Sequence, residues 1–186
     1  FFESHIDFFI IIIFNYIKNY TQYFVFCKVF VLIQPQYIVL LIYAYENVYT
    51  IVIVGEVRDS AAIDMLTAMN TGHDGSLSTG HANSAYDMIT RLESMVLMGI
   101  ELPMEAVRRQ IASAVDIIIH LGRLRDGSRK VTEICEVTGI ENGQVQLTSL
   151  YEFEEQAEKG RKTVQGYLKK KAALQNKEKL KRAGLE

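Results

Sequence analysis

Residues 51–84 read IVIVGEVRDSAAIDMLTAMNTGHDGSLSTGHANS, and this stretch decides the fold class of the chain. Its first four residues are β-branched and do not alternate with polar residues, which is typical of a strand buried on both faces in a parallel sheet. Apolar residues then recur at helical spacing over residues 61–71, and residues 76–79 are expected to form a second short strand. A helix that ends near residue 98 is expected next, because Ser84, with an acidic residue three positions later, resembles a capping box. The alternation of strand and helix predicts an α/β domain with a parallel sheet.

The second half of the chain is expected to supply scaffold elements. Pro103 fits the first turn of a helix that runs to about residue 114, with Arg108 and Arg109 on its outer face. The segment 116–153 contains three strand-like runs, and the breaks between them, RDG and ENG, are hairpin signals. This segment is therefore expected to form an antiparallel meander.

Composition excludes several classes of protein. The chain has 186 residues and a formal net charge of −2, so it carries no global signature of nucleic-acid binding. Its two cysteines, Cys27 and Cys135, are far apart, which argues against a disulfide framework or a zinc ribbon and fits a reducing compartment. Cys135 is expected to be a small core residue of the meander.

Residues 1–50 differ in composition from the rest of the chain. They contain 8 of the 9 Phe and 7 of the 10 Tyr, but only five charged residues. The longest uncharged run, residues 29–45, has 17 residues and is interrupted by Gln-Pro-Gln. It therefore falls just short of the about 20 apolar residues of a spanning helix, and acidic residues stand where a signal peptide has a basic region. Three interpretations stay open: a membrane-associated segment, a buried hydrophobic layer, or a non-native segment translated from AT-rich DNA.

The C-terminal segment is basic. Residues 159–182 carry ten of the twenty Lys and Arg and a single acidic residue. We interpret this segment as a charged, partly helical, solvated terminus rather than a surface for anionic lipid or nucleic acid, because only one aromatic residue is interleaved. The predicted organisation is an atypical aromatic and aliphatic segment at 1–50, an α/β domain at 51–155 and a basic tail at 156–186.

Polar residues follow both predicted parallel strands. Glu56 comes after the strand at residues 51–54, and Thr79, Gly80 and His81 stand at the end of the next strand. Because the carboxyl ends of parallel strands meet at one edge of a sheet, we expect these residues to lie close together. A carboxylate there can orient a water molecule or a Mg²⁺ ion, and imidazole and hydroxyl groups can donate to a phosphate. The structural alternative is that Glu56 caps the following helix and that His81 bonds a neighbouring strand end.

These residues carry a resemblance to a known family. The motifs VGE at 54–56, TGH at 71–73 and STGHANS at 78–84 occur in the order and spacing of the type II/type IV secretion ATPases. The resemblance extends from about residue 51 to the end of the chain. It is closest to the branch that powers tight-adherence (Flp-type) pilus assembly.

The resemblance implies a fold and a site. The fold would be the C-terminal part of a RecA-like P-loop NTPase core, a parallel sheet with flanking helices, followed by the antiparallel meander. Glu56 would be the Walker B acid that activates the attacking water, and His81 would belong to the histidine box that senses the γ-phosphate. The supporting nucleotide-binding residues would be Gly55, Arg58, Thr79, Gly80 and Arg91.

The resemblance also implies ligands and partners. These are ATP with Mg²⁺, a homo-hexameric assembly and an inner-membrane secretion or pilus platform protein, with no specific nucleic acid. The implied location is the cytoplasm, at the inner face of the plasma membrane. The basic residues at the first hairpin break would form either a solvated tip or a contact to a neighbouring subunit's nucleotide; they are Arg123, Arg125, Arg129 and Lys130.

The sequence departs from the family before residue 51, where family members carry a P-loop, an acidic box and an arginine-rich stretch, and an N-terminal domain before those. It contains no G-x-x-x-x-G-K-[ST] motif, and the nearest string, GRKT at residues 160–163, lacks the glycine spacing. Without this motif no lysine reaches the β- and γ-phosphates, so we expect the chain alone to bind nucleotide weakly and to hydrolyse it negligibly. The alternative functions are a non-catalytic assembly module and a membrane-anchored regulatory module of a secretion or pilus machine.

Overall fold

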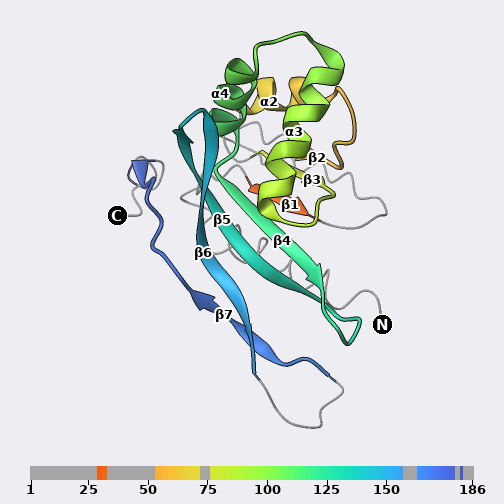
Figure 1. The fold of residues 1–186 in the computed structure, drawn as a ribbon, viewed down its shortest axis with the longest axis vertical. Coiled ribbons are helices and arrows are strands. Elements are labelled where there is room, and N and C mark those ends of the chain that lie inside the picture. Colours follow the sequence, from red (N-terminus) through yellow and green to blue (C-terminus); the bar gives the residue numbers. More distant parts are fainter. Residues whose placement is uncertain (1–28, 33–52, 72–75, 157–162, 179–180, 182–186) are drawn as a thin grey trace, which may run out of the picture. The chain divides into compact units, whose positions relative to one another are not determined.

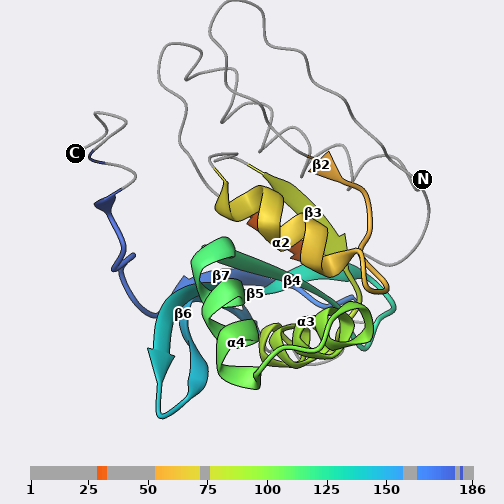
Figure 2. The ribbon, with the colours of Figure 1, turned by 90° about the horizontal axis from the view of Figure 1, so that it is seen from above.

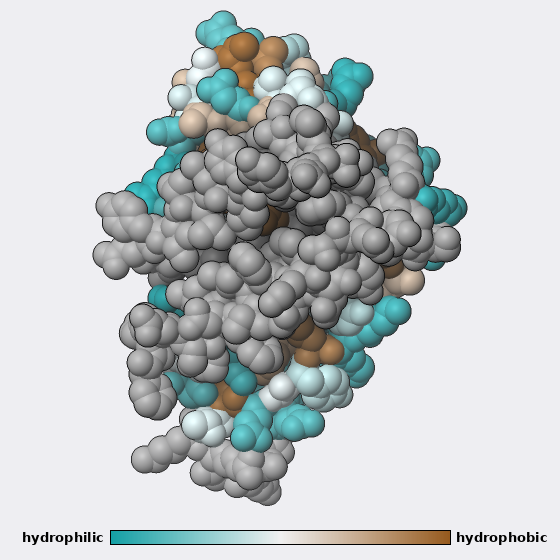
Figure 3. All heavy atoms as spheres, turned by 180° about the vertical axis from the view of Figure 1, so that it is seen from behind, coloured by the Kyte–Doolittle hydropathy of each residue, from teal (hydrophilic) through white to brown (hydrophobic). Residues whose placement is uncertain are grey.

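The computed structural model describes residues 29–32, 53–71, 76–156, 163–178 and 181. His5, His73 and most of the uncharged run discussed above lie outside the described residues. None of the helices in the described part of the chain is long and apolar enough to cross a bilayer. Seen from behind (Figure 3), the described residues at the margins of the view are mainly hydrophilic.

Four parallel strands form one half of the sheet, within a compact unit of residues 27–175. Their spatial order is β2 (Ile53–Val54), β3 (Leu77–Gly80), β1 (Val29–Leu32) and β4 (Ile117–Arg123) (Figure 1). In the centre, Leu32 of β1 pairs with Gly80 on one side and with His120 on the other. The carboxyl ends of β3 and β1 therefore lie at one level, and β4 runs on beyond them.

Three helices connect these strands and pack against one another (Figure 2). They are α2 (Ala62–Asn70), α3 (Ala85–Gly99) and α4 (Met104–Ala114). The steps from β2 to β3 and from β3 to β4 run in the same direction across the sheet, and right-handed crossovers then place all three helices on one face. The predicted alternation of strand and helix is confirmed.

The predicted helix starts are also found. The Ser84 side chain accepts a hydrogen bond from the Asp87 N–H at 3.0 Å, which is the cap predicted for α3. Asp59 accepts from the Ala61 N–H at 3.0 Å just before α2, and Pro103 directly precedes α4. Local hydrogen bonds thus set two of the three helix entries.

One core joins the helices to both halves of the sheet. Its members are buried apolar side chains, among them Leu66, Met69, Leu92, Met95, Val107, Ile111, Ile118, Cys135 and Val145. The prediction for Cys135 is confirmed, and burial raises the pKa of its thiol, which makes it a poor nucleophile. The prediction for Arg108 is wrong: its Nε donates to Glu93 at 2.7 Å, and its guanidinium also bonds the carbonyl of Gly143, so that this side chain lies between α3 and the sheet.

The predicted meander is found as the antiparallel half of the sheet. It comprises β4, β5 (Arg129–Glu141), β6 (Gln144–Glu155) and β7 (Gly166–Lys170). Asn142 and Gly143 have φ of 51° and 73°, the left-handed pair of a type I′ hairpin, as the ENG break indicates. The strand β7 differs from the expected partly helical tail. Cross-strand ion pairs of 2.8 Å, Lys169 with Glu154 and Lys171 with Glu152, place this basic segment beside β6.

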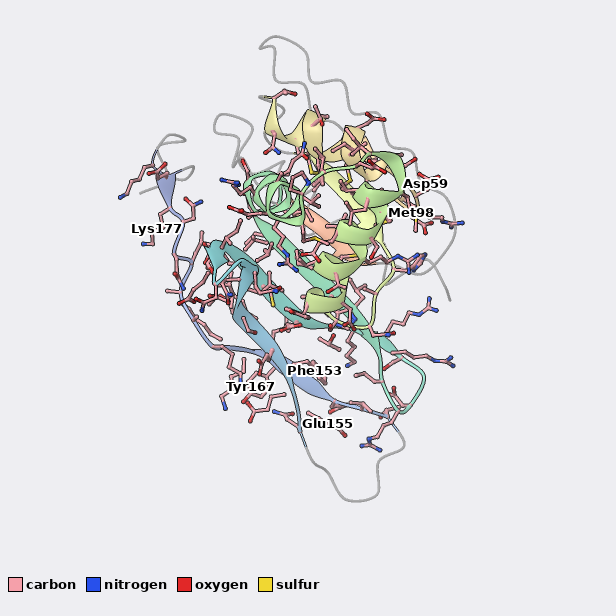
Figure 4. All side chains as sticks on the ribbon, turned by 45° about the horizontal axis from the view of Figure 1, so that its top comes forward. Asp59, Met98, Phe153, Glu155, Tyr167 and Lys177 are labelled. Atoms are coloured by element: carbon pink, nitrogen blue, oxygen red, sulfur yellow. The ribbon has the colours of Figure 1, made fainter. Side chains whose placement is uncertain are left out.

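A first prediction concerns the close approach of α3 to the turn before α2. A Cβ added at Gly99 would lie 2.7 Å from the Ser60 Cβ, and neither atom can rotate away because both are bonded to the backbone. Figure 4 labels Met98 and Asp59, the sequence neighbours of these two residues. We expect Gly99→Ala to lower the free energy of unfolding by about 1 kcal/mol or more, because overpacking outweighs the gain in helix propensity.

Urea unfolding measures this effect, and Ser60→Gly supplies the control. In the Ser60→Gly background the obstructing Cβ is absent, so Gly99→Ala should cost less. An equal cost in both backgrounds would show that the contact does not limit this position.

A second prediction concerns Asp126 in the β4–β5 turn. Its carboxylate accepts the Ser128 hydroxyl at 2.6 Å, the Ser128 N–H at 3.0 Å and the Val164 N–H at 2.6 Å. These bonds, the Ser128 hydroxyl first, lower the pKa of Asp126 from 3.8 to about 2. The ionised form therefore stabilises the folded state above pH ~4, and this contribution is lost as the pH falls toward 2.

Asp126→Asn is accordingly expected to destabilise the chain at neutral pH. Its difference from the wild type should shrink as the pH is lowered from about 4 to about 2, because Asn carries no charge to lose. Chemical denaturation at a series of pH values measures this difference. A difference that is constant over this range would contradict the assignment.

Candidate functional site

The backbone around Glu56 is fastened to strand β3. The Val57 N–H donates to the Thr79 carbonyl at 3.0 Å, and the Thr79 hydroxyl donates to the Gly55 carbonyl. The residues before and after Glu56 are therefore both held by one residue of the neighbouring strand. This arrangement fixes the position from which the Glu56 side chain extends past the end of β2.

The Glu56 carboxylate lies between two basic side chains. Its Oε2 accepts from Arg58 Nη2 at 2.5 Å, and its Oε1 lies 2.8 Å from His81 Nε2. The carboxylate and the imidazole are 19% and 26% exposed, whereas the Arg58 side chain is 63% exposed. The predicted proximity of Glu56 and His81 is thus confirmed, and both side chains are partly exposed although Glu56 Oε1 itself is buried.

The two oxygens of Glu56 are not equivalent. Oε2 carries the hydrogen bond from Arg58, but no donor in the described part of the chain makes an aligned hydrogen bond to Oε1, despite its ion-pair contact with His81. The hydrogen bond from Arg58 lowers the pKa of Glu56, desolvation opposes this, and the charge of His81 lowers it further. At neutral pH the site therefore offers an ionised carboxylate, whose Oε1 is buried beside His81 and makes no aligned hydrogen bond within the described residues.

A hollow of about 640 Å³ opens beside His81, beyond the carboxyl ends of the parallel strands. Its lining includes the β3–α3 loop, one side chain of α3 and the facing parts of β4 and β5. We call it the basic hollow and define it by His81, Arg91, His120, Arg123, Arg129 and Thr132. Ligands of open α/β sheets bind in this position.

The other predicted site residues have three different placements. Gly55 and Thr79 hold the backbone described above, whereas Gly80 and Arg91 line the basic hollow. Arg58 reaches Glu56 from the more exposed side of the site. The structure thus brings Gly80, His81 and Arg91 together at one wall, although Arg91 comes from a separate helix.

The β4–β5 wall was predicted only in part, since Arg123 and Arg129 were expected to form either a solvated tip or a contact to a neighbouring subunit's nucleotide. His120 is a residue of strand β4, and Thr132 Oγ1 lies 3.0 Å from its Nδ1. Burial lowers the pKa of His120, so the ring is neutral at pH 7. Only the pairing of β4 with β5 reveals that this histidine also lines the hollow, with Arg123 and Arg129 directly opposite each other in the ladder.

The described residues do not form a closed metal site. No group of three His, Cys, Asp or Glu side chains among them converges as metal ligands. Proteins commonly hold Mg²⁺ through one or two carboxylates together with substrate phosphates, and Glu56 could supply one such carboxylate. The donor set thus fits Mg²⁺ only in company with a phosphate ligand.

Comparison with known proteins gives a family match over most of the chain. The family model described as type II/IV secretion system protein matches residues 50–183. A putative conjugal transfer protein of Mycobacterium tuberculosis is 37% identical over 100 residues, which are 54% of this chain and 28% of that protein. A probable conjugal transfer protein TrbB of Sinorhizobium fredii is 38% identical over 108 residues, which are 58% of this chain and 32% of that protein.

A solved structure is also similar. The crystal structure of the VirB11 ATPase from the Brucella suis type IV secretion system, in complex with sulphate, aligns with a TM-score of 0.45 and 25% identity. The alignment covers 60% of this chain and 40% of that one. The matched region is thus less than half the length of each of these proteins.

A third prediction follows from the contact between Arg58 and Glu56. Arg58→Gln removes the largest influence that keeps the pKa of Glu56 low, so that pKa should rise. A carboxyl ¹³C titration by NMR measures it. Arg109→Gln is the matched control, because Arg109 pairs with Glu105 on α4 and makes no contact with Glu56. An unchanged pKa in Arg58→Gln would contradict the contact.

Proposed function

The chain belongs to the type II/IV secretion system protein family, and on this premise we propose that it is the C-terminal portion of a secretion ATPase. In the complete protein, hydrolysis of ATP would be coupled to protein secretion or pilus biogenesis. The matched region is about a third of the length of the conjugal transfer proteins that it resembles. The activity proposed here is therefore that of the whole protein.

One observation carries the proposal: the position of Glu56 and His81. An ionised carboxylate and an imidazole lie 2.8 Å apart at the carboxyl end of a parallel strand, beside a hollow lined by cationic side chains. A nucleoside triphosphatase needs a carboxylate at such a place to orient the attacking water, and hydrogen-bond donors for the phosphate that is transferred.

The residues of this chain have separate parts in the proposed mechanism. Glu56 would orient the attacking water, while Arg58 holds Oε2 and keeps the carboxylate ionised. His81 would contact both Glu56 and the terminal phosphate, and so transmit the state of the nucleotide to the β3–α3 loop. Gly55 and Thr79 keep Glu56 in place, and Gly80 and Arg91 would stand beside the phosphates. ATP would bring Mg²⁺, which supplies charge neutralisation at the phosphates.

The branch of the family, the oligomeric state, the partner protein, the location and the domain boundaries are part of the same proposal. The residue motifs favour the tight-adherence branch, a homo-hexamer and a platform protein of the inner membrane as partner, with the chain on the cytoplasmic side of that membrane. We further propose that residues 51–155 form the C-terminal part of the RecA-like domain, to whose sheet β1 and β7 add strands, and that residues 156–186 form its basic tail. The missing P-loop motif leads us to expect that the 186-residue chain alone has negligible turnover.

The fourth prediction tests the role of Glu56 where a P-loop is present. Residues 51–183 would replace the corresponding segment of a complete family member that hydrolyses ATP. In this chimera Glu56→Gln is expected to lower kcat by about 100-fold or more, with little change in nucleotide affinity, because the change removes the group that orients water. Steady-state ATPase assays and nucleotide titration measure the two quantities.

Glu105→Gln is the matched control. Its side chain is 70% exposed on α4, so the same change of charge should leave kcat unaltered. Turnover that is independent of Glu56 would overturn the proposed role and favour a non-catalytic assembly module. In the 186-residue chain alone, turnover above that of its own Glu56→Gln variant would overturn the expected inactivity.

A further inference from the structure

Exposed apolar side chains gather at the turn between α3 and α4. Eight large apolar side chains are exposed in the described part of the chain, and four of them lie within residues 97–104. They are Leu97, Met98, Ile100 and Met104, and Met98 is 70% exposed. We call these four residues the α3–α4 corner. A contiguous group of exposed apolar side chains marks an interaction site, whereas single exposed ones are ordinary.

The backbone of the corner is fixed by local contacts. Gly99 lies between two of its members, and a Cβ added there would come within 2.7 Å of the Ser60 Cβ. The Ile100 N–H donates to the Val96 carbonyl at 3.2 Å, which closes the last turn of α3. A surface that is already ordered loses little conformational entropy when a partner binds.

The charges around the corner are negative. Glu101 is exposed within it, and the Glu105 side chain, which follows in α4, is 70% exposed. Asp59 is exposed on the turn that packs against Gly99. Residues 94–107 contain no Lys or Arg. Neither Glu101 nor Asp59 forms an ion pair with any described residue, so their charges are available to a partner.

This combination of side chains selects the chemistry of the partner. The flexible side chains of methionine adapt to different apolar surfaces, and carboxylates at the edge favour lysine and arginine on the facing molecule. An amphipathic helix that carries basic residues beside its apolar face meets both requirements. A membrane of anionic lipid does not, because the same carboxylates would be repelled by its surface.

A second copy of this chain fits the corner less well. The basic segment at β7 uses its charges within its own sheet, where Lys169 pairs with Glu154 and Lys171 with Glu152, each at 2.8 Å. Docking these lysines on the corner of another copy would break both pairs. A helix from a different protein avoids this cost.

We propose that the α3–α4 corner binds a basic amphipathic helix of another protein, with Met98 as the apolar anchor and Glu101 as a charged contact. The corner lies at the end of α3 that is remote from His81 (Figure 1), and Figure 4 labels Met98 there. The inference goes beyond the ATPase activity proposed above and does not depend on it, because none of the corner residues lines the basic hollow.

The fifth prediction uses a synthetic peptide as the probe. The peptide has about 18 residues of leucine and lysine in an amphipathic helical pattern, with one tryptophan on its apolar face. The 186-residue chain contains no tryptophan, so the emission reports on the peptide alone. Binding should shift this emission to shorter wavelength, and Met98→Gln should weaken binding about fivefold or more, because an apolar anchor is lost.

Leu168→Gln is the matched control for this variant. Leu168 is an exposed apolar residue of β7, outside the corner, so this variant should bind like the wild type. Glu101→Gln should also weaken binding, and its effect should shrink at high salt, since salt screens exposed charges. A peptide with glutamate in place of lysine should bind about tenfold more weakly than the basic one.

Several results would overturn the proposal. These are absence of peptide binding, equal affinities for the wild type and Met98→Gln, and equal binding of the acidic and basic peptides. Met98-dependent binding to vesicles of anionic lipid, or Met98-dependent self-association in sedimentation, would assign the corner to a membrane or to a second copy instead. Met104→Gln supplies a second variant of the corner if circular dichroism shows that Met98→Gln is poorly folded.

Discussion

The alignment of the parallel strands at one edge of the sheet is the constraint on which the rest of the structure depends. Thr79 enforces it between β2 and β3, since its carbonyl accepts the Val57 N–H and its hydroxyl bonds the Gly55 carbonyl. Held on both sides, Glu56 can extend only past the strand ends, where the next loop presents His81. A sheet with a slipped register would separate these two side chains, because each strand residue rises about 3.3 Å.

A second constraint joins the helices to the antiparallel half of the sheet. Arg108 on α4 bonds Glu93 on α3 and the carbonyl of Gly143 in the β5–β6 turn. Taking these charges out of water costs free energy, and their hydrogen bonds offset part of it. The same helix α3 carries Arg91, which lines the basic hollow. The apolar core that runs from Leu66 to Val145 supplies the larger part of the cohesion.

The parts of the fold that could be predicted are those with local causes. The Ser84 cap, the helical spacing after it, the ENG turn and the unbroken β-branched run at β2 are each set by neighbouring residues. The prediction for Arg108 failed because helical periodicity identifies a face but not what packs on it, and a carboxylate on another helix made the inner position favourable. The strand β7 was missed for a similar reason. Its lysines pair with glutamates of β6 that are far away in the sequence.

The amino-acid sequence by itself determined the order of strands and helices, the family, and the meeting of Glu56 with His81. These follow from hydrophobic period, local capping and the rule that parallel strands bring their carboxyl ends together. Only the tertiary structure decided that Arg91 and Arg123, which pair with no carboxylate among the described residues, line one hollow. Arg91 and Arg123 are 32 residues apart in the sequence. The packing of the helices on the sheet and the register of β4 with β5 place both of them beside the same hollow. Long-range pairing of this kind depends on how elements pack, which no local pattern of residues encodes.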